Sequence, residues 1–230
     1  MKRVLISWSS GKDSAWTLHL LRQQTGLEIA GLLTTFNESA DRVAMHAVRR
    51  DLVGAQASAA DLSLRAIDLP APCTNAEYEE RMRAAIERAR AEGITHIAFG
   101  DLFLEDIRAY RERQLAGTGI DPLFPLWGKP SDTPALAWRM LDAGLEAVLT
   151  CVDAKQLDGR FVGRRFDRAL LDELPGGVDP CGERGEFHTF CHAGPMFAAP
   201  IPVRVGEIVV KDGFHFADLL RADRSSVPGK

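Results

Sequence analysis

The first half of the chain alternates short apolar runs with amphipathic stretches. The apolar runs are bounded by turn residues and predict buried strands. They cover residues 4–8, 28–36, 64–69 and 94–99. The stretches between them have the apolar spacing of helices, over residues 15–21, 46–61, 75–93 and a segment with Ile107, Tyr110 and Leu115. Strands that alternate with helices are joined in parallel by right-handed crossovers, so we predict an α/β fold with a doubly wound, Rossmann-like parallel sheet.

The pattern changes near residue 128, after a short proline-bounded segment. Beyond it we expect a helix, a strand, a long loop and a hairpin turning at Asp212 and Gly213, over residues 131–144, 145–152, 175–192 and 204–216. In the 75–93 helix, Asn75 is the expected N-cap and Gly93 the expected stop. We therefore predict one domain over residues 1–128, a smaller α+β domain over 129–220 and a disordered tail over 221–230.

The composition is ordinary for a globular protein, with 46% hydrophobic and 26% charged residues. A formal net charge of -4 gives no general basic field, so nucleic acid is not expected as a partner. Lys2 and Arg3 precede only a short apolar run, and no 18-residue apolar span exists. We expect a cytoplasmic protein with no membrane partner.

The four cysteines form no Cys-x-x-Cys pair, which favours reduced thiols over a disulfide framework. An alternative is zinc held by Cys181, His188, Cys191 and His192, which lie within twelve residues. On a strand the adjacent Cys191 and His192 would point to opposite sides, and the spacing matches no standard zinc motif. Zinc is therefore not expected.

A polar turn joins the first strand to the first helix. Backbone N–H groups at a helix N-terminus lack intrahelical partners and the helix dipole adds positive charge there, so the turn suits an anion. It is not a mononucleotide P-loop, because Asp13 follows Lys12 and Ser7 replaces the first glycine of that motif. The turn consists of Ser9, Ser10, Gly11, Lys12, Asp13 and Ser14.

Position decides between an anion site and a plain helix cap, for which serine and aspartate are also suited. The turn lies at the first strand-to-helix junction of an alternating chain, where such folds bind nucleotides. Two further segments follow the second and fourth strands: residues 34–38, which include Thr35 and Phe36, and Gly100 with Asp101. Taken alone, Asn37 and Glu38 of the first segment would indicate a plain turn. The carboxyl ends of parallel strands share one edge, so the three segments predict one nucleotide site. For Asp101, a helix N-cap is an equal alternative.

Two charged residues of the turn have candidate roles beside phosphate. Asp13 is the candidate magnesium ligand, because a carboxylate next to triphosphate oxygens can share a hard cation with them. Lys12 can neutralise charge that develops on the phosphates. The alternatives are a helix cap for Asp13 and a solvent-exposed lysine for Lys12.

A second polar cluster covers residues 179–190. Three carboxylates, an arginine and a histidine lie among glycines there, and such groups are costly to hold together unless they bind a ligand or face solvent. Glu183, Glu186 and His188 are its candidate functional residues. The alternative is a surface loop that leads into an edge strand.

Three motifs together resemble the diphthine ammonia ligase family of ATP pyrophosphatases, adenine nucleotide alpha hydrolase-like proteins of the PP-loop superfamily. They are Ser-Ser-Gly-Lys-Asp-Ser at 9–14, Gly-Asp-Leu-Phe-Leu-Glu-Asp-Ile-Arg-Ala-Tyr-Arg-Glu at 100–112 and Gly-Glu-Arg-Gly-Glu-Phe-His-Thr at 182–189. Met45-His46, Pro-Leu-Trp-Gly-Lys at 125–129 and Gly194-Pro195 extend the likeness, which reaches to about Leu219. The family's eukaryotic ligase has Glu-Gly-Gly-Glu where this chain has Glu-Arg-Gly-Glu at 183–186.

The resemblance implies ATP and Mg2+ as cofactors. A carboxylate would attack the α-phosphate, release pyrophosphate and form an acyl-adenylate, which ammonia would convert to an amide. The first domain would bind ATP and the second the acceptor, a small molecule or a protein whose identity stays open, as does homo-oligomer formation. The implied nucleotide-binding residues are Ser9, Ser10, Gly11, Lys12, Asp13, Ser14, Thr35, Phe36, His46, Gly100 and Asp101, with Asp13 on the metal. The implied catalytic residues are Lys12, Asp13, Glu183, Glu186 and His188, the last three serving the acceptor and ammonia.

Two other functions compete with this one. The first is ATP-dependent tRNA modification, as in other members of the superfamily, although the paired cysteines of its sulfur-transfer enzymes are absent. The second is a non-catalytic nucleotide sensor, which would not need the Lys12 and Asp13 pair. Arg108 and Arg111 are candidates for clamping an acidic acceptor, with exposed helix arginines as the alternative.

Overall fold

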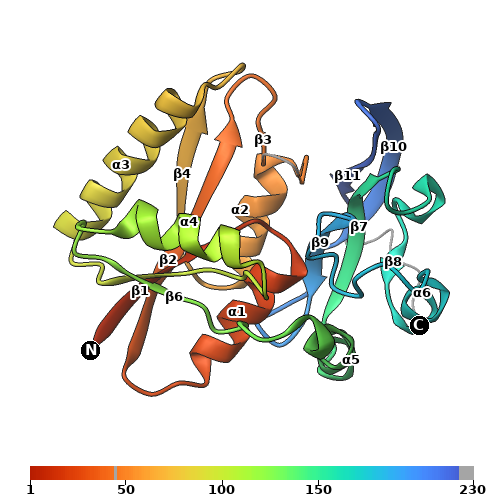
Figure 1. Cartoon of the computed structure of the whole chain (residues 1–230), viewed down its shortest axis with the longest axis horizontal. Coiled ribbons are helices and arrows are strands. Elements are labelled where there is room, and N and C mark those ends of the chain that lie inside the picture. Colours follow the sequence, from red (N-terminus) through yellow and green to blue (C-terminus); the bar gives the residue numbers. More distant parts are fainter. Residues whose placement is uncertain (44–45, 223–230) are drawn as a thin grey trace.

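The protein folds around two sheets that lie side by side (Figure 1). The computed structural model describes residues 1–43 and 46–222. In sheet A the order β4-β2-β1-β5-β6 is parallel throughout, and β3 adds an antiparallel pair at the end of β2. These strands are β1 (Lys2–Ser7), β2 (Leu27–Asn37), β3 (Arg42–Val43), β4 (Leu64–Leu69), β5 (His96–Ala98) and β6 (Asp121–Leu123).

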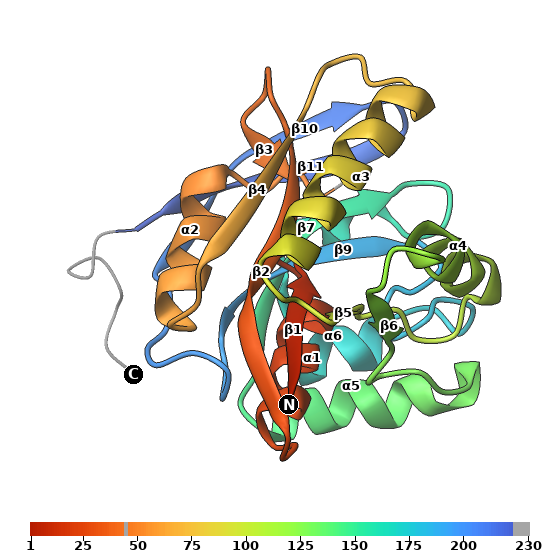
Figure 2. The same cartoon turned by 90° about the vertical axis from the view of Figure 1, so that its left-hand side faces the viewer.

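Helices cover both faces of sheet A, as Figure 2 also shows. Side chains of β1 alternate between the faces: Val4 and Ile6 pack with α1 and α2, whereas Leu5 packs with α3 and with Leu115 of α4. The predicted doubly wound α/β fold is therefore confirmed. The four helices are α1 (Lys12–Arg22), α2 (Arg50–Ala59), α3 (Asn75–Ala91) and α4 (Glu105–Leu115).

Sheet B is smaller and antiparallel, and it belongs to the second half of the chain. Its order is β10-β11-β7-β8, with β9 also paired to β7. The strands are β7 (Glu146–Asp153), β8 (Arg165–Phe166), β9 (Phe187–Ala193), β10 (Val203–Lys211) and β11 (Phe214–Arg221). The helices beside them are α5 (Thr133–Asp142), α6 (Arg168–Glu173) and the single 3-10 turns η1 (Pro130–Asp132) and η2 (Gly159–Phe161). This architecture confirms the predicted smaller α+β part.

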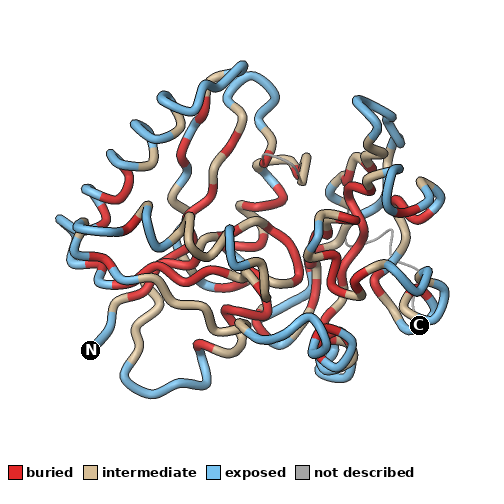
Figure 3. Tube along the Cα trace, in the orientation of Figure 1, coloured by how far each residue is buried: buried red, intermediate tan, exposed pale blue. Residues whose placement is uncertain are grey.

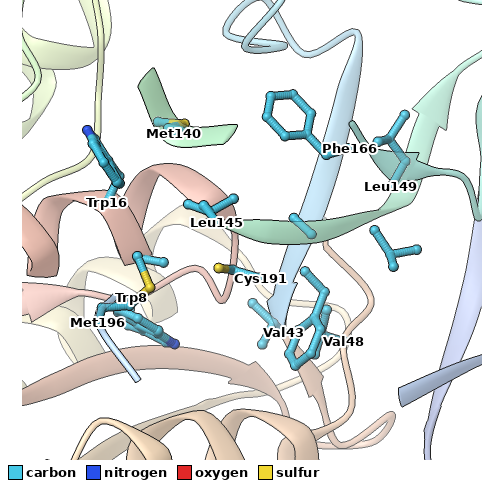
Figure 4. Close-up of a cluster of buried hydrophobic side chains, with 14 of the residues drawn as sticks. Trp8, Trp16, Val43, Val48, Met140, Leu145, Leu149, Phe166, Cys191 and Met196 are labelled. Carbon is cyan, nitrogen blue, oxygen red and sulfur yellow. The ribbon is translucent and has the colours of Figure 1, made fainter. Parts of the chain in front are cut away.

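One hydrophobic core runs from sheet A into sheet B. Figure 3 shows buried segments in both halves of the molecule, and Figure 4 shows Trp8 and Trp16 in the same cluster as Met140, Leu145 and Phe166. All five side chains are at most 6% exposed. The predicted boundary at residue 128 therefore separates two sheets that share a core.

The predicted ends of several helices need correction. The helix predicted over 46–61 begins only at Arg50, because Ala47 turns the chain with a φ of 54°. Thr74, rather than Asn75, caps α3: its Oγ1 accepts the N–H of Glu77, whose carboxylate accepts the N–H of Thr74. Gly93, with a φ of 80°, follows the end of α3 as predicted.

The second half contains a further correction. The segment predicted as loop over 175–192 includes most of β9, which begins at Phe187. The predicted hairpin is confirmed and turns at Asp212 and Gly213, but its strands are longer than expected, so Arg221 ends β11 instead of opening a tail. The rest of that predicted tail, residues 223–230, lies outside the described residues. Within the described part, no helix has both the length and the apolar character to cross a bilayer.

Candidate functional site

A cavity of about 480 Å³ opens where β1, β2 and β5 of sheet A end. This volume is in the range of small-molecule sites. The three segments predicted for nucleotide binding meet here, and the second polar cluster joins them from the other half of the chain. The polar lining includes Ser9, Asp13, Ser14, Thr35, His46, Gly100, Asp101, Arg111, Glu183, His188 and Thr189. Apolar and aromatic side chains complete the lining and include Ile67, Tyr78, Met82, Phe99 and Ile107.

The 9–14 turn is bonded internally and to the second half of the chain. The hydroxyl of Ser9 accepts the N–H of Gly11 at 3.3 Å and lies 3.2 Å from the hydroxyl of Ser14. Ser10 has a φ of 71°, and its carbonyl accepts the N–H of Cys191 at 3.0 Å. The Ser10 side chain is fully buried and does not line the cavity. Ser10 therefore contributes to the site through its backbone alone.

Lys12 lies inside the protein and is 1% exposed. Its Nζ donates to the Asp13 carboxylate at 2.9 Å and to the Cys181 carbonyl, and its N–H donates to Thr189 Oγ1 at 3.1 Å. Although burial opposes the charge, the Asp13 carboxylate raises the pKa of Lys12 above its usual value. The solvent-exposed alternative for Lys12 is therefore wrong. Its charge lies beneath the turn, beside the cavity rather than on its lining.

Gly100 and Asp101 connect the end of β5 to the start of α1. A Cβ on Gly100 would lie 3.0 Å from backbone atoms of Asp13 and Ser14, so a larger residue would require this backbone to shift by a few tenths of an ångström. Asp101 does not cap α4, whose N-cap is Leu104. Burial raises the pKa of Asp101, and its carboxylate lies 3.6 Å from Nε of Arg111. The N-cap alternative for Asp101 is therefore wrong, and the side chain faces the cavity.

The two arginines proposed as acceptor clamps lie in different places. Arg111 lines the cavity and stacks over Phe99, with 5.0 Å from Cζ to the ring centroid. Arg108 instead lies over Phe124 and pairs with Glu112 at 2.8 Å. Only Arg111 is placed to meet a ligand in this cavity.

Glu183 comes from the second polar cluster and lines the cavity. Its carboxylate accepts the N–H of Leu102 at 2.7 Å. Burial, opposed by this hydrogen bond and helped by the carboxylates of Asp13 and Asp101, raises the pKa of Glu183 to about 7. A carboxyl with this pKa exchanges protons near neutral pH.

Glu186 is only three residues away but is 2% exposed and does not line the cavity. One of its oxygens accepts the N–H of Asp179 at 2.8 Å, and the other accepts the N–H of Arg184 at 2.9 Å. These bonds close the loop that presents Glu183. This geometry favours a positioning role for Glu186 over the predicted contact with acceptor and ammonia.

Two histidines form one wall of the cavity. The rings of His46 and His188 lie 4.5 Å apart between centroids, and Nδ1 of His46 is 3.4 Å from the carbonyl of Thr189. Burial lowers the pKa of His46 to about 3, helped by the neighbouring His188, and that of His188 to about 4. Both imidazoles are therefore neutral at pH 7 and can accept a hydrogen bond.

Phe36 and Thr35 lie on opposite faces of β2. Thr35 lines the cavity, whereas Phe36 is fully buried in the core, with the Arg50 guanidinium 4.0 Å from its ring centroid. The structure therefore does not bring the Phe36 side chain to the predicted nucleotide site.

The sequence did not predict that Thr189 and side chains of α3 line the cavity. Tyr78 and Met82 of α3 have only the spacing of an ordinary helix face, so nothing in the sequence marks them as lining residues.

The oxygen donors in the cavity fit a divalent cation in part. Among the described residues, no three His, Cys, Asp or Glu side chains gather as a metal site. Asp13 and Asp101 nevertheless line the same cavity, and Oδ2 of Asp101 is buried without a hydrogen-bond partner among the described atoms. Mg2+ usually takes one or two carboxylates and completes its shell with phosphate and water, which these residues allow.

Comparisons with known proteins agree with the layout of the chain. Two family models match it, "Diphthamide synthase N-terminal domain" over residues 1–121 and "Diphthamide synthase C-terminal domain" over residues 132–224. The diphthine–ammonia ligase of Rattus norvegicus is 28% identical over 174 residues, which cover 68% of this chain and 63% of the relative. The enzyme of the same name from Homo sapiens is 29% identical over 153 residues, 63% of this chain and 55% of the relative. The chain thus spans less than two thirds of the length of these relatives.

Proposed function

The chain belongs to the diphthamide synthase family, and from this premise we propose that it is an ATP-dependent amide ligase. It adenylates a carboxylate with release of pyrophosphate and then forms an amide with ammonia. The observation that supports this most directly is the meeting of the 9–14 turn with Glu183 and His188 in one cavity. In this proposal the turn binds the phosphates during adenylation, and Glu183 and His188 accept protons during amide formation.

ATP occupies the cavity with its phosphates at the turn. The N-terminus of α1 and the hydroxyls of Ser9 and Ser14 bind the phosphates, and the apolar lining receives the base. Lys12 adds positive charge beneath the turn and stabilises the charge that develops on the leaving pyrophosphate. Asp13 and Asp101 would hold Mg2+, which would neutralise phosphate charge.

The second half-reaction needs ammonia with a free electron pair. Glu183, with a pKa of about 7, accepts a proton from ammonium beside the adenylate. The ammonia nitrogen then attacks the acyl carbon, the bond to the AMP oxygen breaks, and the nitrogen loses a proton to a neutral acceptor. We assign this role to His188, because its ring is neutral at pH 7 and lines the same cavity.

The decisive experiment incubates the protein with ATP, Mg2+, ammonium and a panel of carboxylic acids and separates the nucleotides by chromatography. Formation of AMP and pyrophosphate that depends on one acid supports the ligase. ADP as the product, or no turnover with any acid, refutes it. Stimulation by tRNA in place of an acid would favour tRNA modification instead.

A matched pair of variants ties the activity to this site. Lys12→Met should abolish AMP formation, because it removes the charge beneath the turn. Lys155→Met makes the same change at an exposed position outside the cavity and should leave AMP formation unchanged.

A further inference from the structure

A second cleft, of about 700 Å³, lies between α1, the segment 125–129 and α5. This segment is the Pro-Leu-Trp-Gly-Lys run that the sequence marks out and that the proposed reaction does not use. The cleft combines aromatic walls with cationic side chains. It is lined by Trp16, His19, Trp127, Lys129 and Arg139, among others.

The charges of the cleft favour an anion. Lys129 and Arg139 are exposed, and neither forms an ion pair within the described residues. Asp132 is the single carboxylate in the described lining, and its Oδ2 is engaged by the N–H of Lys129 at 2.9 Å. His19 stacks on Trp16 with 4.5 Å between ring centroids, and burial lowers its pKa, so it adds no charge at pH 7. Two positive side chains and one carboxylate therefore line this aromatic cleft, so its net charge is positive.

A single residue joins this cleft to the first cavity. Leu102 lines the second cleft, and its carbonyl accepts the N–H of Gly128 at 2.8 Å. Its own N–H donates to Glu183, which lines the first cavity, at 2.7 Å. The backbone of the 125–129 segment is therefore linked through one residue, Leu102, to the residue proposed to accept the ammonium proton.

We propose that this cleft recognises the acceptor acid, and that the acceptor carries a second anionic group besides the carboxylate that reacts. Lys129 and Arg139 bind this second anion, and Trp16 and Trp127 pack against the apolar body of the molecule. The assignment to the acceptor rests on the proposed ligase function. The reacting carboxylate extends past Leu102 toward the phosphates in the first cavity.

The test measures binding by calorimetry to the whole protein, with isophthalate as the probe and the uncharged isophthalamide as its matched control. Isophthalate should bind saturably and the diamide at least about tenfold more weakly, a difference of about 1.4 kcal/mol. Lys129→Ala and Arg139→Ala should each weaken isophthalate binding at least about tenfold. Arg160→Ala removes an exposed arginine outside the cleft and should change nothing. An acetylated Glu-Phe-Glu peptide, titrated in the same way, shows whether a free acid or a peptide side chain binds more tightly.

Equal binding in all variants, or no saturable binding of either acidic probe, overturns the proposal. Pyrophosphate binding to the 9–14 turn should be the same in Arg139→Ala as in the parent protein, so a general loss of folding would be recognised. With an acid that supports turnover, Arg139→Ala should raise KM for the acid and leave KM for ATP unchanged. Absence of AMP with every acid, with isophthalate binding intact, would refute the ligase function and the acceptor assignment but not the affinity of the cleft for acids.

Discussion

Glu183 and Glu186 carry the same functional group three residues apart, yet they do different work. Glu183 lines the cavity with a pKa near 7, whereas both oxygens of Glu186 are engaged by backbone N–H groups of its own loop. The difference comes from the path of the loop, which turns Glu186 inward. The sequence shows two carboxylates, but it does not show which of them lines the cavity.

The first prediction concerns stability at Glu186. Glu186→Gln replaces one accepting oxygen by an amide that faces a backbone N–H, so the free energy of unfolding should fall by about 2 kcal/mol, the range for buried hydrogen bonds to a charged group. Urea unfolding at pH 7 measures it. Glu173→Gln changes an exposed carboxylate whose ion pair with Arg164 is screened by solvent, so it should destabilise the protein much less. An unchanged stability of Glu186→Gln would show that its carboxylate is not needed to close the loop.

The second prediction concerns pH. The folded protein holds His188 neutral with a pKa of about 4, while the unfolded chain protonates it near pH 6.5, so His188 makes stability fall as the pH falls. Glu183 acts in the opposite direction, because its raised pKa of about 7 lets the folded state bind the proton first.

These signs can be measured by urea unfolding at pH 7 and pH 5. Between them Glu183→Gln should lose about 2 kcal/mol more stability than the parent protein, and His188→Gln about 1 to 2 kcal/mol less. Titrating groups outside the cavity are common to the three proteins and cancel in the comparison, whereas Asp13 and Asp101 are coupled to Glu183 and His46 is coupled to His188. Identical losses in all three would mean that neither group has a shifted pKa.

At the level of elements, the site depends on how closely the end of β5 approaches the start of α1. Gly100 sets this approach, because a Cβ there would lie 3.0 Å from the backbone of Asp13 and Ser14. The first turn of α1 holds the amides that would face phosphate. A small change at the strand end therefore reaches the anion site directly.

The third prediction follows from this contact. Gly100→Ala should push the strand end and the turn apart and weaken pyrophosphate binding at least about tenfold, which calorimetry measures. Gly54→Ala is the matched control, because nothing lies within 4 Å of a Cβ at this position in α2. The alanine should stabilise the helix by about 0.5 to 1 kcal/mol and leave pyrophosphate binding unchanged. Full pyrophosphate affinity in Gly100→Ala would show that the turn tolerates the displacement.

The elements also show what the sequence could and could not predict. Strands such as β4 were predicted correctly, because buried apolar runs between turn residues have few other interpretations. β9 was predicted largely as loop, because His188 and Thr189 interrupt its apolar pattern with side chains that face the cavity rather than solvent. The same polar side chains led to the prediction that this cluster is functional, while its strand was missed. The prediction that Phe36 binds nucleotide was made without knowing which face of β2 its side chain is on. Successive side chains of a strand point to opposite faces, so Thr35 lines the cavity and Phe36 does not.

At the level of the whole molecule, the two sheets share one core, and an ion-pair cluster ties their edges. Asp218 of β11 accepts from Arg42 at 2.8 Å and from Arg49 at 2.6 Å, so the start of α2 is fixed to sheet B. The doubly wound parallel sheet, the strand β7 and the hairpin of β10 and β11 were predicted from the sequence, but the rest of sheet B was not. The shared core was not predicted either, because apolar residues do not record which sheet they will face.

The fourth prediction tests whether the shared core makes the two sheets fold as one unit. The whole chain should unfold in urea in a single transition that coincides by circular dichroism and tryptophan fluorescence. Residues 1–128 alone would expose Trp8 and Trp16, which pack against the second half, and should show no cooperative transition. A cooperative transition of residues 1–128 would instead establish the predicted boundary as that of an independent domain.

The Lys12 amide finds its hydroxyl partner 177 residues further along, at Thr189. Proteins emerge from the ribosome N-terminus first and fold as they emerge. A growing chain that has reached residue 130 contains the residues of every strand of sheet A, but it still lacks β9, whose Thr189 and Cys191 bond to the 9–14 turn. If ATP binds at this turn as proposed, only the nearly finished polypeptide should bind it, and chains released early by the ribosome should not.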